Sequence, residues 1–178
     1  MQEPDPRTVA AARRGDMGAF EELVRAFQGD VWRLCLQLLR EDALADDATQ
    51  EAFVKVYRFL PRFRGDSKFT TWLFSIARNC AMDELRRVQR RKRTTERAIS
   101  EPEAPSQEVG TALEVREALD ELPELARESV VLIDMFGLSY REAAEICGAP
   151  VGTIKSRVHQ ARRLLARSLL EGEETGEI

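Results

Sequence analysis

The sequence predicts an all-α protein made of two small helical domains. Apolar residues recur at spacings of three and four in both halves, which is the period of an amphipathic helix. No stretch alternates with the period of two that a half-buried strand needs. Between the halves, TTERAISEPEAPSQEVGT at 94–111 lacks an apolar period and has the composition of a flexible acidic linker. We therefore expect domains at 1–93 and 112–172 and a disordered tail at 173–178.

The composition limits the chemistry that the chain can perform. Its 178 residues are 43% hydrophobic and carry a formal net charge of -4, so two basic stretches stand in an acidic background. The three cysteines are far apart in apolar helical patterns, which is typical of buried thiols in a reducing compartment. Because His159 is the only histidine, we expect no zinc site, no other metal or cofactor and no catalysis. No apolar run is long enough to cross a membrane and no signal-peptide core is visible, so we expect a cytoplasmic protein without membrane insertion.

The first half contains three helical stripes. Asp16 is expected to cap a helix that Gly29-Asp30 ends, and a second stripe follows at 31–39. The run LADDATQEAFVKVYRFLPRF at 44–63 is again helical until Pro61 ends or bends it. By spacing, its core face holds Ala48, Ala52, Phe53, Val56 and Leu60. Polar side chains occupy successive turns of the adjoining face: Asp46, Asp47, Gln50 and Glu51.

The stretch at 68–93 combines an apolar stripe with a strongly basic end. The stripe holds Phe69, Trp72, Leu73, Ile76, Ala77 and Cys80. The outer side is expected to hold Lys68, Thr71, Arg78, Asn79 and Arg86, and the end holds Arg86, Arg87, Arg90, Arg91, Lys92 and Arg93. Such a combination suits the binding of single-stranded or melted DNA. The cations bind the phosphates, and the amide and planar side chains bind unstacked bases. By their spacing we assign Trp72 and Phe69 to the core. The six cations at the end are more than the interaction with the helix dipole would require.

The second half predicts a helix-turn-helix. Pro123 begins a helix that Gly137 ends, and Ser139-Tyr140-Arg141-Glu142 is a capping box for the next helix, which Gly148 stops. Another helix begins near Val151 and turns inward Ile154, Val158, Ala161 and Leu165. Its outer face carries Lys155, Ser156, Arg157, His159, Gln160 and Arg162, and no carboxylate occurs from 150 to 170. An apolar inner side with a cationic, hydrogen-bonding outer side suits the DNA major groove.

The chain resembles a known protein family in four segments, which occur in the same order as in that family. The segments are GDMGAFEELVRAF, DDATQEAFVKVYRFLPRFRGDSKFTTWLFSIARNCAMDELRR, LPELARESVVLIDMFGLSYREAAEICGAP and VGTIKSRVHQARRLL. Over nearly its whole length the chain resembles the bacterial RNA polymerase sigma factors of the extracytoplasmic-function (ECF) group. The resemblance implies a sigma-two domain that docks on core RNA polymerase and reads and opens the minus-ten element. It implies a sigma-four domain that reads the minus-thirty-five element, an anti-sigma factor as partner, and a role in a regulated stress or envelope response.

The resemblance also assigns residues to these partners. Polymerase docking would use Asp47, Gln50, Glu51 and Phe53. Minus-ten DNA, including the melted non-template strand, would meet Asp66, Ser67, Lys68, Arg78, Asn79, Asp83, Arg86 and Arg87. Duplex minus-thirty-five DNA would meet Thr153, Lys155, Ser156, Arg157, His159, Gln160, Arg162 and Arg163, the last two nearer the phosphates. Ala48 and Thr49 stand where the family usually has larger aliphatics, so the packing of the docking helix is left to the structure.

Other interpretations explain fewer of these features. The basic helix could be a merely solvated face, but the capping box, the glycine turn and the absence of acids occur together. An ordinary repressor or activator would leave the Asp47–Glu51 face and the helix of Asn79 without a role. A nuclease or other enzyme is disfavoured, because there are no paired carboxylates in a metal-binding setting, no histidine partner and no phosphate-cradling glycine loop. The sequence does not determine whether the two domains pack together.

Overall fold

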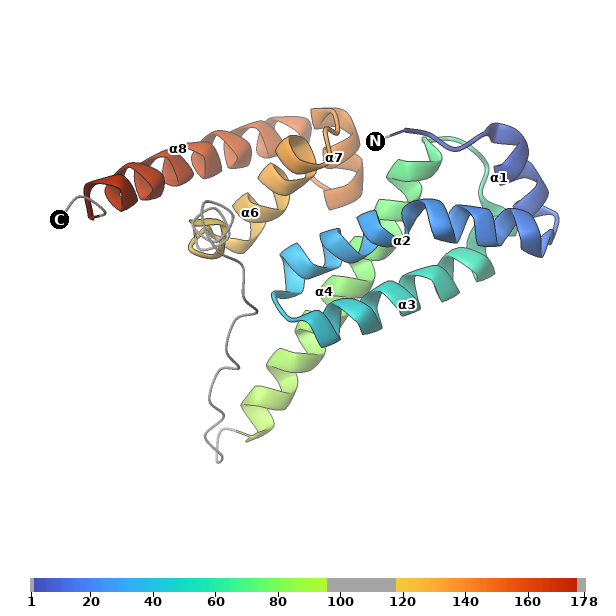
Figure 1. Ribbon diagram of the computed structural model, residues 1–178, viewed down its shortest axis with the longest axis horizontal. Coiled ribbons are helices and arrows are strands. Elements are labelled where there is room, and N and C mark those ends of the chain that lie inside the picture. Colours follow the sequence, from blue (N-terminus) through green and yellow to red (C-terminus); the bar gives the residue numbers. More distant parts are fainter. Residues whose placement is uncertain (1, 96–117, 176–178) are drawn as a thin grey trace.

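The computed structural model describes residues 2–95 and 118–175, with side chains placed for 2–91 and 118–168. Over these residues the chain is helical and has no strand, which confirms the all-α prediction. The elements are α1 Pro6–Arg13, α2 Met17–Leu39, α3 Asp42–Phe59, the 3-10 turn η1 Leu60–Arg62, α4 Phe69–Thr95, α6 Glu124–Val130, the π-helical turn η2 Val131–Met135, α7 Tyr140–Cys147 and α8 Val151–Thr175. Figure 1 shows two groups of helices, α1 to α4 and α6 to α8. Apart from its first two positions, which continue α4, the expected linker lies outside the described residues.

The first unit is built on α2, which begins at its predicted cap. The Asp16 carboxylate accepts a hydrogen bond from the backbone N–H of Ala19 at 3.0 Å. The predicted break at Gly29-Asp30 is wrong, because α2 continues as one helix to Leu39. A glycine inside a helix costs only about 1 kcal/mol relative to alanine. That cost is small compared with the free energy gained by burying the apolar stripe of the helix, which is about 1.5–3 kcal/mol for each large side chain. The stripe consists of Leu23, Phe27, Val31, Leu34 and Leu38.

Helix α3 packs closely because its buried face is made of small residues. Ala45, Ala48 and Ala52 are at most 2% exposed, Val56 and Leu60 are buried as predicted, and Phe53 of the predicted core face is only half-buried. Alanine at these positions allows the helix axes to approach, which accounts for Ala48 in place of a larger aliphatic. Pro61 lies in η1 and ends α3 as expected.

The second unit contains the predicted helix-turn-helix, with its local signals in place. Both hydrogen bonds of the capping box between Ser139 and Glu142 are present at the start of α7. Gly148 ends α7 at φ 61°, a left-handed conformation that favours glycine. The predicted inner residues Ile154 and Val158 of α8 are fully buried. The turn therefore sets the direction of α8 relative to α7.

The two units pack together, which answers the question that the sequence left open. One continuous apolar core joins α1 to α4 with η2, α7 and α8. At its centre Phe74 is fully buried, and its ring meets that of Phe136 edge-on at 5.0 Å. The expectation that Thr71 and Arg78 lie on the outside is wrong: Thr71 is buried, and the Arg78 side chain is only 17% exposed. For Arg78 the reason is tertiary, because its partner belongs to α6 of the second unit.

Candidate nucleic-acid interface and polymerase-docking face

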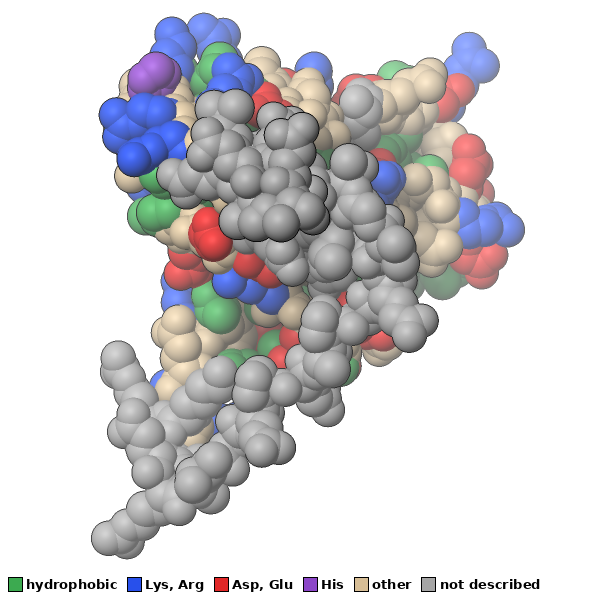
Figure 2. Space-filling view, turned by 60° about the vertical axis from the view of Figure 1, so that its left-hand side comes forward, with side chains coloured by type: hydrophobic (Ala, Val, Ile, Leu, Met, Phe, Trp, Pro, Cys, Tyr) green, Lys and Arg blue, Asp and Glu red, His purple; other side chains and the backbone are tan. Residues whose placement is uncertain are grey.

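The polar side of α8 is the more accessible of the two candidate DNA-binding surfaces. Six of its predicted residues are exposed: Lys155, Ser156, His159, Gln160, Arg162 and Arg163. Thr153 and Arg157 are half-buried. Figure 2 shows Lys and Arg side chains gathered beside the single histidine of the chain. One helix thus presents cations and hydrogen-bonding groups together, as a major-groove reader needs.

Two cations of this face have partners within the protein. Arg162 donates from Nε and Nη2 to the carboxylate of Asp134 at 3.0 and 2.6 Å, and this raises the pKa of Arg162 further above its usual value. The ammonium group of Lys155 lies 5.9 Å from the centroid of the Tyr140 ring. Asp134 belongs to η2, so a carboxylate from another element partly neutralises the positive charge of the α8 face. The sequence pattern did not predict this pairing, because Asp134 lies 28 positions from Arg162 and outside α8.

The predicted minus-ten residues fall in two adjacent segments. The turn before α4 holds Asp66, Ser67 and Lys68, and α4 holds Arg78, Asn79, Asp83, Arg86 and Arg87. Asn79 and Arg86 are exposed, and Arg86 donates to Asp83 at 2.9 Å. Asp66 forms an exposed ion pair with Arg64 at 3.0 Å. The structure therefore leaves Asn79, Arg86 and Arg87 exposed on α4, whereas Arg78 is largely covered.

Arg78 points into the boundary between the two units. Its Nε and Nη2 donate to the two carboxylate oxygens of Glu128 at 2.5 and 3.3 Å. The Glu128 side chain is 1% exposed. The hydrogen bond from Arg78 to Glu128 raises the pKa of Arg78 above its usual value. As the structure stands, Arg78 is not available to DNA.

Lys68 also reaches across the boundary between the units. Its ammonium group forms an ion pair with Glu142 of α7 at 2.8 Å. Partial burial acts to raise the pKa of Glu142, but the hydrogen bonds from Lys68 and from Ser139 outweigh it and lower the pKa to about 2. The capping-box carboxylate thus serves two purposes: it closes the start of α7 and holds the turn before α4.

A pH-dependent contribution to stability follows from this carboxylate. Its folded-state pKa is depressed, so the stabilisation is present above the ordinary value near 4.5 and is lost as the pH falls through about 2. Glu142→Gln keeps an oxygen for the capping box but removes the charge. Because Lys68 is well exposed, we expect a loss of about 1 kcal/mol in the free energy of unfolding at pH 7, measured by urea titration. This difference from the native protein should shrink between pH 4.5 and 2.

Lys68→Gln and the double variant are the controls for this prediction. If Lys68 supplies most of the effect, the double variant loses less than the sum of the two single losses. A difference that stays constant across the whole pH series would contradict the assignment to the Glu142 charge.

The predicted polymerase-docking residues lie on α3, where two of the four are freely accessible. Asp47 and Gln50 are exposed, whereas Phe53 is half-buried and packs against the core. The half-buried Glu51 accepts from Lys55 at 2.9 Å and from Arg87 of α4 at 3.4 Å. Glu51 therefore links α3 to α4, a connection that the sequence pattern did not predict.

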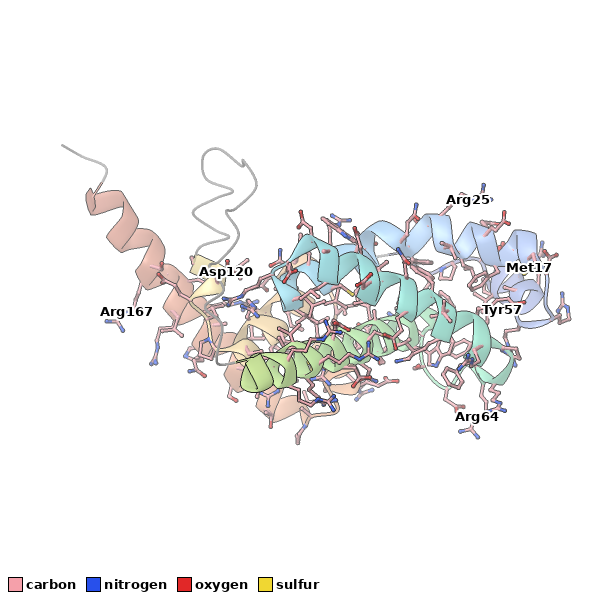
Figure 3. The ribbon with its side chains drawn as sticks, turned by 90° about the horizontal axis from the view of Figure 1, so that it is seen from below. Met17, Arg25, Tyr57, Arg64, Asp120 and Arg167 are labelled. Atoms are coloured by element: carbon pink, nitrogen blue, oxygen red, sulfur yellow. The ribbon has the colours of Figure 1, made fainter. Side chains whose placement is uncertain are left out.

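Sequence reasoning missed two apolar residues of the same face. Val54 is 60% exposed and Tyr57 is 50% exposed. The Tyr57 ring meets that of Phe20 edge-on at 5.1 Å, and Figure 3 shows Tyr57 and Met17 at the same end of the first unit. Both continue the helical spacing of three and four from Asp47 and Gln50, which is the signal that could have found them. An accessible face with polar and apolar side chains together is typical of a protein-binding site.

Other kinds of site find little support in the part of the chain that the structure describes. Within it, no group of histidine, cysteine and acidic residues could hold a metal ion. Cys35 and Cys80 are fully buried, and burial raises the pKa of the Cys35 thiol to about 12. Among the described helices, none is long and apolar enough to span a bilayer.

Comparisons with known proteins agree with this arrangement. Family models match for sigma-70 region 2 at residues 23–91 and for sigma-70 region 4 at residues 112–165. The ECF RNA polymerase sigma factor SigC of Mycobacterium tuberculosis is 37% identical over 170 residues, which cover 93% of this chain and 91% of that protein. The ECF RNA polymerase sigma-E factor of Escherichia coli K12 is 36% identical over 178 residues, covering 90% of this chain and 92% of its own length.

Solved structures give the same result. The sigma factor RpoE of Bartonella quintana, in complex with the anti-sigma factor NepR, matches with a TM-score of 0.74 at 30% identity over 84% of this chain and 96% of that chain. CnrH in complex with the cytosolic domain of CnrY matches with a TM-score of 0.72 at 27% identity over 94% of this chain and 97% of that chain.

The fold, with a helix-turn-helix in one unit and a basic helix in the other, defines a two-module transcription protein of the sigma-70 type. Within that type, the chain belongs to the ECF RNA polymerase sigma factors. It therefore directs core RNA polymerase to specific promoters in transcription initiation, as a regulator of transcription.

Proposed function

We propose that this sigma factor acts in the cytoplasm by binding alone, without catalysis, and that two cationic helices read the promoter jointly. The observation that carries the proposal is the exposed polar face of α8, on a unit separate from that of α4. Each face alone offers only a few contacts. When polymerase holds both at a fixed separation, the second contact becomes intramolecular, and the combined affinity far exceeds either one.

The roles of individual residues follow from their chemistry. Lys155, Gln160 and their neighbours on α8 would contact base edges in the minus-thirty-five duplex, and Arg162 and Arg163 would contact phosphates. On α4, Asn79 would hydrogen-bond an unstacked minus-ten base, while Arg86 and Arg87 would follow the backbone of the melted strand. Opening the duplex costs a few kcal/mol for each flipped base, which these contacts would offset.

The docking face on α3 would bind core RNA polymerase. Asp47 and Gln50 supply exposed polar groups, and Val54 and Tyr57 supply apolar area that is available on the surface. Interfaces typically combine such an apolar centre with a polar rim. Because Glu51 also pairs with Arg87, docking here would act directly on a minus-ten cation.

We further infer that an anti-sigma factor controls this protein in a regulated stress or envelope response. The support comes from two relatives of the same fold: RpoE, in complex with the anti-sigma factor NepR, and CnrH, in complex with the cytosolic domain of CnrY. Binding over the α3 face would keep the sigma factor from polymerase until a signal releases it.

Transcription in vitro with purified core polymerase and a promoter library tests the proposal. We expect transcripts that start at a small set of promoters, and no transcripts from those promoters without the sigma factor. Without polymerase, the protein should not shift duplex promoter DNA at moderate salt, because the two weak contacts are not yet held at the separation of the two promoter elements. A strong shift by the free protein, with no transcription, would identify a repressor or activator instead.

A further inference from the structure

The start of α4 is closed by a carboxylate from the N-terminal segment at residues 2–5. Glu3 accepts hydrogen bonds from the backbone N–H groups of Phe69 and Thr70 at 3.0 and 3.2 Å, and also from the Thr70 hydroxyl. Figure 1 shows the N-terminal end of the described chain beside the start of α4. One carboxylate thus satisfies two of the backbone donors that a helix leaves without intrahelical partners at its N-terminus.

The residue at the capping position of α4 cannot cap the helix itself. Lys68 occupies this position, because its carbonyl oxygen accepts a hydrogen bond from the N–H of Trp72 at 3.1 Å. Helices usually begin at Ser, Thr, Asp or Asn, whose side-chain oxygen accepts from the first turn, whereas a lysine side chain has no acceptor. Its positive charge is also unfavourable at the positive end of the helix dipole. Glu3 therefore supplies both the acceptor and the negative charge that position 68 lacks.

The loop at 64–68 depends on the order of its two ends. At one end, the ring of Phe63 lies 4.8 Å from the ring of Trp72, measured between centroids. At the other end, Phe69 is buried and donates its N–H to Glu3. The loop between these two anchors carries the first three residues of the minus-ten set. A well-ordered first turn of α4 therefore fixes the direction from which the loop presents them.

The remainder of the N-terminal segment is attached less closely. Residues 2–5 line a hollow of about 340 Å³ over α2, together with Glu22 and Asp30. Glu3 itself is exposed, although the hydrogen bonds that it accepts are partly buried. Its bonds to α4 are therefore a specific attachment, which a substitution can remove without opening the apolar core.

We propose that Glu3 is a positioning residue for minus-ten recognition, which holds the first turn of α4 so that position 68 can carry a cation instead of a capping acid. An Asp or Glu cap at position 68 itself would turn a carboxylate toward the DNA phosphates and repel them. A local rule for helix starts is thus broken at a DNA-binding position and compensated from a distance. This inference rests on the proposed function and adds to it a residue that lies before the matched region 2.

Amide hydrogen exchange, followed by NMR on the full-length protein, tests the contact itself. Glu3→Ala removes the acceptor, and we expect the amides of Phe69 and Thr70 to exchange about five-fold faster, which corresponds to the usual contribution of a cap. Glu3→Gln keeps an oxygen but loses the charge, so its exchange rates should lie between those of the native protein and Glu3→Ala. Glu22→Gln removes a charge from α2 beside the same hollow and should change neither amide.

Transcription with core polymerase tests the consequence for DNA recognition. On a promoter that the library identifies, Glu3→Ala should lower transcription about three-fold, because fewer molecules hold the loop in the competent arrangement. On the same promoter with an altered minus-ten sequence, the loop contacts are already lost, so the native protein and Glu3→Ala should give equal amounts of transcript. With an altered minus-thirty-five sequence, the three-fold difference should persist. A purely structural weakening would instead lower transcription from all three promoters alike.

The outcomes separate this inference from the proposed function. The inference is overturned if Glu3→Ala leaves the exchange of both amides unchanged, if its transcription from the intact promoter is native, or if its defect is the same on all three promoters. Should Glu3→Ala fail to fold, Glu3→Gln decides by the same criteria. Absence of transcription by the native protein with core polymerase would overturn the proposed function, and with it the role of Glu3 in DNA recognition.

Discussion

Reversing one charge on α8, with Lys155→Glu, is expected to lower transcription from the cognate promoter by about 100-fold. Loss of one good base contact costs about 1–3 kcal/mol, and a carboxylate in its place adds repulsion from the phosphates. Lys155 is a better choice than Arg157, because Lys155 is exposed whereas Arg157 is half-buried. The measurement is run-off transcription in vitro, with core-polymerase binding measured in parallel by pull-down.

Polymerase binding should be unchanged in this variant, since the docking face that we propose lies on the other unit. Arg167→Glu is the matched control: it makes the same change on the same helix, about 18 Å further along, at a residue that Figure 3 shows extending from α8. If Lys155→Glu and Arg167→Glu reduce transcription equally, the effect is one of general charge and the minus-thirty-five assignment is wrong.

The double variant Asp47→Arg with Val54→Arg is expected to weaken binding to core polymerase by about 100-fold. It puts two cations on a face whose exposed polar and acidic groups favour a basic partner, and like charges across an interface cost several kcal/mol. Both positions are exposed, so the helix content by circular dichroism should be unchanged. Affinity for core polymerase, measured by biolayer interferometry, gives the result directly.

Glu22→Arg is the control for this variant, because it reverses an exposed charge on the side of α2 that faces the N-terminal segment at residues 2–8. We expect it to bind core polymerase with native affinity. Undiminished run-off transcription by the Asp47→Arg, Val54→Arg protein would place the docking surface somewhere else on the molecule.

Local signals in the sequence predicted the helix-turn-helix in detail. The Ser139–Glu142 capping box, the left-handed Gly148 and the inward residues of α8 all depend on interactions within a few positions of the chain. The apolar stripes of α3 and α4 were predictable for the same reason. The continuation of α2 through Gly29-Asp30 was not predictable from local signals. A helix ends where tertiary packing no longer favours it, and the buried stripe of α2 continues past the glycine.

The sequence by itself determined the helices, the order of the two units and the polar faces that they carry, because helical periodicity and capping are local properties. Only the tertiary structure decided which of those faces are accessible. Arg78 meets Glu128 fifty positions away, and Arg162 meets Asp134 twenty-eight positions away. Such pairs form because packing brings distant carboxylates next to cations and removes water from between them, and no periodicity along the chain records that proximity.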